Sequence, residues 1–208
     1  RRMLENPEAL IAGMRIILQI FPKAKGIFGI ENNKPDCIEK FQELVKGEDR
    51  MEVCALETKY PQGGERSLIY AITGKKLNSK KLPADLGCIV HNVDTIYSIY
   101  RAVYEGKPLI KRIVTVTGDA IKNPKNFEVR LGTSVDEIIE GAGGFVAEPE
   151  KIISGGPMMG FSFFNTAVPL VKGSSSVLAF VKDDVAASDI SPSSAEDVLM
   201  HVLRIFFL

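Results

Sequence analysis

Apolar residues recur at helical spacing in four stretches of the first half of the chain. In each stretch they fall three or four positions apart, which places them on one face of a helix. The predicted helices span residues 8–21, 33–47, 67–74 and 93–104. Short apolar runs at residues 25–30, 51–56 and 88–90 alternate with these helices and predict strands, the last being a short strand or an extended segment. This alternation favours an α/β layered domain.

The pattern changes after residues 106–108, a Gly-Lys-Pro sequence that predicts a hinge. Period-two alternation at residues 113–117 and 127–131 predicts two strands. Ser134 and Glu137 then form a capping-box signature for a short helix through Glu140. Apolar positions at 152–153 and 177–181 predict further strands. Two strands, one helix and more strands favour a small α+β unit of the β-grasp kind. The predicted parts are residues 1–107, 108–182 and a tail at 183–208.

Composition narrows the functional classes. The chain has 208 residues with 26 basic and 26 acidic side chains, and this balance argues against nucleic-acid binding. No apolar run reaches 18 residues, so no membrane span is expected. The three cysteines (Cys37, Cys54 and Cys88) include no C-x-x-C pair, which predicts buried thiols in a reducing compartment and no zinc knuckle. A first residue other than Met, with Pro7 opening a helix, predicts a piece of a longer protein.

Two polar turns carry the candidate chemistry. The first reads Tyr-Pro-Gln-Gly-Gly-Glu-Arg at residues 60–66, directly before a predicted helix. Glycines before a helix let backbone N–H groups approach a phosphate, and two such turns side by side would present these groups to one anion. The alternative is a turn in which Gly63 and Gly64 merely supply positive φ, and residues alone favour that alternative about two to one. Arg66 could pair with a phosphate or with Glu65.

The second turn reads Val-His-Asn-Val-Asp-Thr at residues 90–95. Asn92 is expected to cap the following helix, and its amide could also read the polar edge of a ring. His91 could hydrogen-bond a ligand or be structural, and His201 is too distant in sequence to argue for a metal pair with it. The glycines at residues 141–144 follow a helix, so a helix end is expected there and not a dinucleotide loop.

Another glycine-rich segment, at residues 154–160, fits loop packing or docking to another domain equally well. No hydrolase triad or phosphate-binding Walker loop is recognisable in the sequence.

Several phrases in order resemble the C subunit of the Rnf electron-transport complex, over roughly residues 1–182. They lie at residues 31–36, 58–65, 82–85, 114–118 and 153–160. The first part is more distantly similar to the flavoprotein subunit of respiratory complex I, which binds FMN and oxidises NADH. The part from residue 113 to about 144 is similar to the soluble-ligand-binding β-grasp domain of both families. The resemblance implies a Rossmann-like flavin-domain portion followed by this β-grasp domain.

The resemblance also implies roles for individual residues. The relative's Tyr-x-x-Gly-Glu-Glu turn is matched by Tyr60, Gly63 and Glu65, with Gly64 in place of the first Glu. Its Asn-Asn-Val-Glu-Thr turn is matched by Asn92, Val93 and Thr95, with His91 in place of the first Asn. The implied flavin-binding residues are Tyr60, Gly63, Gly64, Glu65, His91, Asn92 and Thr95.

The implied activity is electron transfer between NAD(H), FMN and iron–sulfur centres in a ferredoxin:NAD oxidoreductase at the cytoplasmic face of the membrane. The expected partners are other Rnf subunits and a ferredoxin-linked electron chain. The family's flavin loop, barrel-like N-terminal domain and cluster-binding cysteines are missing from these 208 residues. We therefore expect weak FMN binding, clusters only in the full-length subunit and an inactive isolated chain. The alternative is a non-catalytic docking module whose β-grasp unit contacts another protein of the complex.

Overall fold

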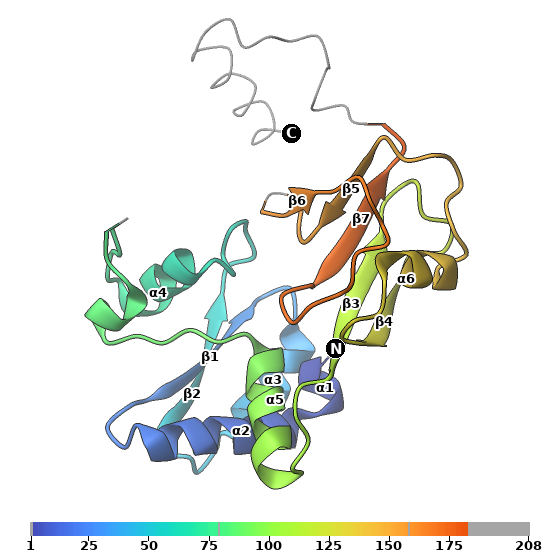
Figure 1. The fold of residues 1–208 in the computed structure, drawn as a ribbon. Coiled ribbons are helices and arrows are strands. Elements are labelled where there is room, and N and C mark those ends of the chain that lie inside the picture. Colours follow the sequence, from blue (N-terminus) through green and yellow to red (C-terminus); the bar gives the residue numbers. More distant parts are fainter. Residues whose placement is uncertain (1, 79, 158, 183–208) are drawn as a thin grey trace, which may run out of the picture. The chain divides into compact units, whose positions relative to one another are not determined.

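The computed structural model describes residues 2–78, 80–157 and 159–182, arranged in two compact units, Arg1–Pro108 and Leu109–Leu208 (Figure 1). Both units contain helices and strands, so the mixed α/β class predicted from the sequence is confirmed at that level. The predicted tail at 183–208, including His201, lies outside the described residues.

The first unit is built on two parallel strands, β1 (Gly26–Glu31) and β2 (Met51–Leu56), with Phe28 opposite Val53. Parallel strands need a crossover connection, and α3 (Pro35–Leu44) supplies it. The other helices of this unit are α1 (Arg2–Glu5), α2 (Pro7–Ile20), α4 (Glu65–Thr73), the 3-10 helix η1 (Pro83–Leu86) and α5 (Val93–Tyr104). The four helices predicted from periodicity are present, whereas α1 and η1 were not predicted.

The core of this unit lies between the sheet and the helices α2, α3 and α5. Leu10 and Phe41 are fully buried, and the Phe28 and Phe41 rings meet edge to face with centroids 4.9 Å apart. Helices α2 and α5 approach closely because position 13 is glycine. A Cβ there would lie only 2.5 Å from the Ile96 carbonyl oxygen. This packing fixes α5, at whose start Asn92 and Thr95 lie.

Two sequence expectations for this unit need correction. Residues 88–90 form no strand, so of the two predicted alternatives the strand is wrong. Cys88 N–H donates to the carbonyl of Pro83, the first residue of η1, and Ile89 is 58% exposed, so the run neither pairs nor is buried. Of the three thiols only Cys37 is buried, and burial raises its pKa. Cys54 lies on the sheet face opposite the core and is only partly covered, since side chains alternate along a strand.

The second unit is a five-stranded mixed sheet in the order β4-β3-β7-β5-β6. Its strands are β3 (Lys111–Thr117), β4 (Lys125–Arg130), β5 (Lys151–Ser154), β6 (Phe161–Ser162) and β7 (Ser176–Phe180). Helix α6 (Val135–Gly141) packs Val135, Ile138 and Ile139 into the same core as the sheet. The predicted capping box is confirmed, because Ser134 Oγ accepts from Glu137 N–H. Strand β6 was not predicted, since it has only two residues.

The glycines after α6 end that helix, as the sequence indicated. Gly143 and Gly144 have φ of 86° and 79°, a left-handed conformation that a helix end uses and that L side chains rarely adopt. A dinucleotide loop is therefore not present at this segment.

Candidate functional site

The first polar turn connects β2 to α4 and is anchored to the loop after β1. Asn32 Oδ1 accepts from Thr58 N–H at 3.2 Å and from Thr58 Oγ1 at 2.8 Å, and Asn33 N–H donates to Thr58 Oγ1 at 3.3 Å. These bonds fix the start of the loop that carries Tyr60. Tyr60 itself is 60% exposed, and its peptide bond to Pro61 is cis. These bonds join the loop after β1 to the loop after β2, and this connection positions the turn.

Gly63 and Gly64 do not supply positive φ. Both lie outside the left-handed region, and Gly64 has φ −67° and ψ 135°. The alternative interpretation, that the two glycines are present merely to supply positive φ, is therefore wrong. A Cβ at Gly63 would meet no atom within 4 Å, whereas one at Gly64 would lie 3.0 Å from the Pro61 carbonyl oxygen. The described residues give no steric reason for glycine at position 63, and the space beside it is open to a ligand.

The N-terminus of α4 is left open to an anion. Gly64 is its N-cap, and no side chain among the described residues caps the first turn of the helix, so its leading N–H groups are available to a ligand. Arg66 is exposed and makes no ion pair with Glu65 or any other residue that the structure describes. The nearby guanidinium, the uncapped N–H groups and the space at Gly63 together can bind a phosphate.

The N-terminus of α5, by contrast, is already occupied by the chain. Asn92 Oδ1 accepts from Asp94 N–H at 2.9 Å, so its expected capping role is confirmed. The Asp94 carboxylate accepts from Arg2 Nε at 2.9 Å, and the Arg2 guanidinium lies 4.2 Å from the Tyr97 ring centroid. The Asn92 amide N–H₂ and the Thr95 hydroxyl have no partner among the described residues and are available to a ligand, and both residues are exposed. His91 is exposed as well.

All seven predicted site residues belong to the first unit. Figure 1 shows the loop after β2 and the N-terminus of α5 toward the same end of this unit, the end at which β1 and β2 finish. No hydrogen bond or ion pair among the described residues joins the two turns to each other. The seven residues therefore form two groups, Tyr60 to Glu65 and His91 to Thr95.

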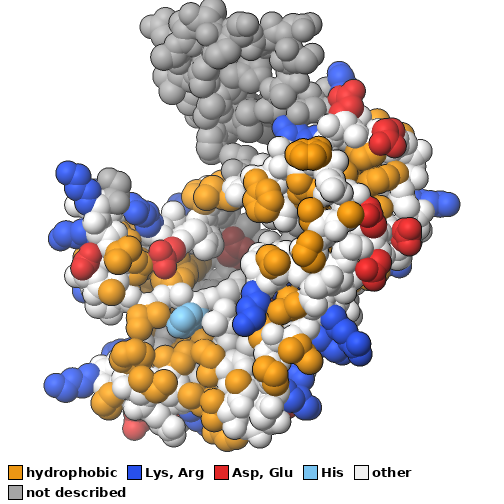
Figure 2. Space-filling model, viewed as in Figure 1, with side chains coloured by type: hydrophobic (Ala, Val, Ile, Leu, Met, Phe, Trp, Pro, Cys, Tyr) orange, Lys and Arg blue, Asp and Glu red, His pale blue; other side chains and the backbone are white. Residues whose placement is uncertain are grey.

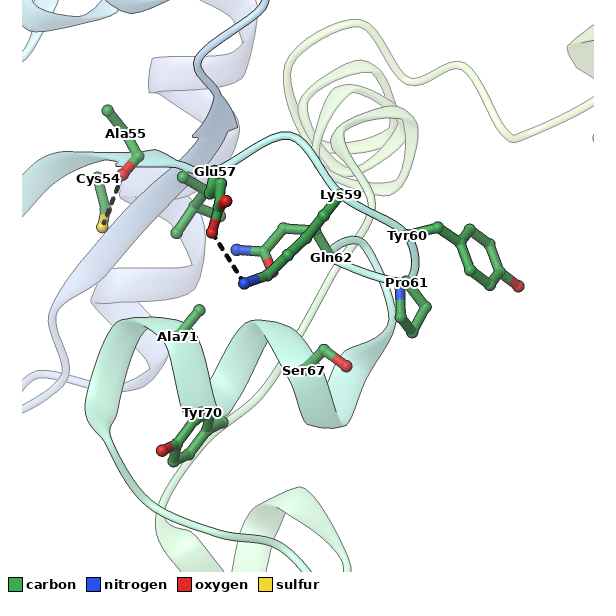
Figure 3. Close-up of a pocket in the computed structure, with 11 residues that line it drawn as sticks. Cys54, Ala55, Glu57, Lys59, Tyr60, Pro61, Gln62, Ser67, Tyr70 and Ala71 are labelled. Carbon is green, nitrogen blue, oxygen red and sulfur yellow. Dashed lines mark hydrogen bonds and ion pairs between the residues drawn. The ribbon is translucent and has the colours of Figure 1, made fainter. Parts of the chain in front are cut away.

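A pocket of about 400 Å³ lies beside the first turn, between β2 and α4 (Figure 3). It is lined by residues of the segment 54–71 alone, with none from the Asn92 turn. Lys59 Nζ donates to Glu57 Oε2 at 2.9 Å, and this bond lowers the pKa of the Glu57 carboxyl. Gln62 was not singled out within the turn by sequence reasoning, yet it is only 6% exposed. Its burial depends on tertiary packing, and a polar turn carries no local signal for it.

Comparison with protein families matches residues 1–101 to the Nuo51 FMN-binding domain and residues 113–162 to the SLBB domain. A curated relative, the C subunit of the proton-translocating ferredoxin:NAD(+) oxidoreductase complex of Clostridium ljungdahlii, is 49% identical over 185 residues. That match covers 89% of this chain and 40% of the relative. The C subunit of the Na(+)-translocating complex of Acetobacterium woodii is 44% identical over 181 residues, covering 87% and 41% respectively.

A third relative, the C subunit of the ion-translocating oxidoreductase complex of Yersinia pestis, is 37% identical over 189 residues. That match covers 91% of this chain and 30% of the relative, so the chain spans well under half the length of each of these three proteins. The resemblance indicated by the five sequence phrases is confirmed by these matches. In the part of the chain that the structure describes, no helix has the length and apolar character needed to cross a bilayer.

Proposed function

We propose that this chain is the FMN-binding part of a C subunit of an Rnf-type ferredoxin:NAD oxidoreductase complex. The premise is its homology to the C subunits of these complexes. The observation that carries this proposal is the 49% identity over 89% of the chain, together with the FMN-domain match over its first 101 residues. The complex would transfer electrons between NAD(H) and ferredoxin at the cytoplasmic face of the membrane, where the chain would lie peripherally among the other subunits.

The finer fold assignment is part of the proposal. The β1–α3–β2 crossover supports a Rossmann-like portion in residues 1–107. The β3–β4 hairpin, α6 and the returning strands support a β-grasp domain in residues 108–182. The described residues contain no group of three or more His, Cys, Asp or Glu side chains able to hold a metal ion. The proposal places iron–sulfur clusters in the full-length subunit, as the resemblance implies.

The residues of the two turns fit FMN in complementary ways. The uncapped N-terminus of α4 and the space at Gly63 suit its phosphate, with Gly64 and Glu65 forming the rim. The exposed Tyr60 ring would lie against the isoalloxazine or ribityl chain. The Asn92 oxygen caps α5, and its amide N–H₂ would donate to a carbonyl oxygen or ring nitrogen of the flavin, beside Thr95 and His91. When bound, the flavin supplies the hydride and electron chemistry.

Asn92→Asp tests this assignment most sharply. Aspartate caps a helix as well as asparagine does, so the bond to Asp94 N–H and the stability of α5 should be retained. The amide donor is lost and a negative charge is added, so FMN affinity should fall about tenfold, which corresponds to about 1.4 kcal/mol. FMN is titrated calorimetrically into the parent chain and the variant, and Asn126→Asp in the second unit is the control.

The 208-residue chain should bind FMN weakly, and a version extended upstream to the length of the relatives should bind it more tightly. Equal FMN affinity of the parent and Asn92→Asp chains would remove the second turn from the site. Tight binding by the short chain would show that the proposed division of the cradle is wrong.

A non-catalytic docking role is the second candidate, and one observation favours it. Met159, Phe161 and Phe164 around β6 are 87, 70 and 103% exposed, and Figure 2 shows apolar side chains on the visible face of this unit. Exposed apolar side chains gathered on one edge are typical of protein contacts. Purified full-length protein without flavin absorbance would favour this role over the first.

A further inference from the structure

Arg112 occupies a position of β3 at which the alternation along the strand predicts an apolar side chain. It lies on the same face as Val114 and Val116, which are fully buried, because side chains alternate along a strand. Its partner across the sheet is Val129, which belongs to the same core. A guanidinium is always charged, and charged side chains rarely occupy core positions without a partner. The cation at position 112 therefore needs a reason other than packing.

The Arg112 guanidinium has one edge engaged and one edge without a partner. Its Nη1 donates to the Lys172 carbonyl, which holds the group against the loop before β7. Its Nε is fully buried without a hydrogen-bond partner, the single buried side-chain nitrogen or oxygen of this kind among the residues that the structure describes. No carboxylate in that part of the chain pairs with Arg112. Nε–H and the adjacent N–H of Nη2 form a fork that can donate two parallel hydrogen bonds to one carboxylate.

The unpartnered Nε is unfavourable in the folded chain. Buried polar groups nearly always have a hydrogen-bond partner, and buried charges are paired, because their removal from water is otherwise uncompensated. A carboxylate at this edge would supply both the acceptor and the opposite charge. Since Arg112 as a whole is only half-buried, part of its side chain reaches the surface. The bond to Lys172 orients the guanidinium before a ligand arrives, which lowers the ordering cost of binding.

The loop that holds the Arg112 guanidinium leaves room for a ligand. Val171 N–H donates to Ser174 Oγ at 3.1 Å, and Ser174 N–H donates to the Val171 carbonyl at 3.0 Å, so the loop is a closed turn. Between these two residues Lys172 and Gly173 are exposed, and a Cβ at Gly173 would meet no atom within 4 Å. An open turn that carries a lysine suits a negatively charged ligand.

Further basic side chains lie at the same end of the sheet. Lys111 directly precedes Arg112 and is opposite Arg130 of β4. Lys111 also pairs with Glu128 at 3.3 Å, but the two side chains are 43% and 54% exposed, so this pair is weak. The electrostatic field at this end of β3 therefore favours the approach of an anion.

We propose that the Nε and Nη2 edge of Arg112 is a binding site for a carboxylate. A carboxylate is planar and matches the fork with two oxygens, whereas a tetrahedral phosphate needs more room at a nitrogen that is fully covered. The group belongs to a free organic acid or to an acidic side chain of another protein, and both present the same two oxygens. The site lies in the second unit, so it goes beyond the flavin proposal and does not depend on it.

The test follows the arginine Nε–H signals of the isotope-labelled 208-residue chain by NMR while sodium acetate is added, with sodium chloride at equal ionic strength as the reference. The Arg112 signal is recognised by its slow exchange with solvent, since Nε is buried, and by its absence from Arg112→Lys. We expect it to shift downfield and to saturate at millimolar acetate, because a charge-assisted hydrogen bond forms.

The variants measure what the fork contributes. Lysine keeps the charge without the fork, so Arg112→Lys should weaken acetate about tenfold, read from the backbone amide signals of Lys172 and Gly173. The matched control is Arg130→Lys, whose side chain lies on the opposite face of the sheet and whose replacement should leave acetate affinity unchanged. Succinate and a short polyglutamate peptide distinguish the two sources of the carboxylate, because the natural kind of ligand should bind more tightly than the other.

Two results would overturn the inference. One is an Arg112 signal that moves no further in acetate than in chloride, a measurement on the parent chain that does not depend on any variant. The other is unchanged acetate affinity in a folded Arg112→Lys chain. Arg112→Lys should bind FMN as the parent does, and Asn92→Asp should bind acetate as the parent does, so failure of the flavin proposal is recognised separately.

Discussion

Replacing Gly63 by alanine separates a conformational role of this glycine from a binding role. The φ of Gly63 lies outside the left-handed range, and a Cβ there would have no neighbour within 4 Å. The folded chain therefore accepts alanine without strain. Gly-to-Ala replacement at such a compatible position raises the free energy of unfolding by about 0.4–1 kcal/mol, because the unfolded chain loses freedom. We expect the Tm to stay constant or rise by a few degrees.

The same methyl group should obstruct FMN. If backbone at position 63 approaches the phosphate as proposed, the added Cβ overpacks that contact, which costs about 1–3 kcal/mol. FMN affinity should then fall by about 5- to 150-fold. Thermal unfolding and calorimetric FMN titration of the same preparations measure both effects.

The matched control is Gly173→Ala in the second unit. Gly173 also has no positive φ and no atom within 4 Å of an added Cβ, so stability should respond as at position 63 while FMN affinity stays unchanged. A Gly63→Ala chain that is stable and binds FMN as tightly as the parent would refute the reasoning. It would mean that the open space at this glycine is not where the flavin lies.

Three further predictions concern the scaffold. Arg2→Met should lower the free energy of unfolding of the first unit by about 1–2 kcal/mol in chemical denaturation, since a partly buried ion pair to Asp94 and a cation–π contact are both lost. Gly118→Ala should prevent the second unit from folding, judged by circular dichroism, because φ is +116° and a Cβ would lie 2.0 Å from the Ala179 carbonyl oxygen. Burial raises the pKa of the Cys37 thiol, so the neutral thiol stabilises the fold at pH values below the ordinary thiol pKa. This contribution to the free energy of unfolding is lost as the pH rises through the pKa of Cys37 in the folded chain. Cys37→Ala should abolish this decline in the free energy of unfolding at alkaline pH.

Most of the helices and strands were predictable because they depend on local periodicity. Residues 93–104, for example, carry the apolar face of α5, and Asn92 directly before them supplies its cap. The predictions that failed concern features that depend on contacts with residues distant in the sequence. The apolar run at 88–90 finds no strand to pair with, and β6 exists only because Ile153 and Ser154 of β5 pair with it. Likewise, no local pattern could reveal that Gln62 is only 6% exposed, because burial depends on tertiary packing.

The two turns, if side by side, were expected to form one rim of backbone N–H groups aimed at one anion, and their hydrogen bonds argue for unequal roles. At α5 the Asn92 oxygen already accepts from Asp94 N–H in the first turn of the helix, and an approaching phosphate would compete with this cap. Each helix carries one acidic residue in its first turn, Asp94 at α5 and Glu65 at α4, so these charges do not distinguish the two ends. At α4 no side chain caps the helix, and Arg66 makes no ion pair with the residues that the structure describes. We therefore propose that the phosphate of a bound flavin lies at α4 and that the neutral, hydrogen-bond-accepting ring edge lies at Asn92. Under this arrangement Arg66→Gln should weaken FMN more than riboflavin, which lacks the phosphate, whereas Asn92→Asp should weaken both. Equal loss of both ligands in Arg66→Gln would reverse the assignment.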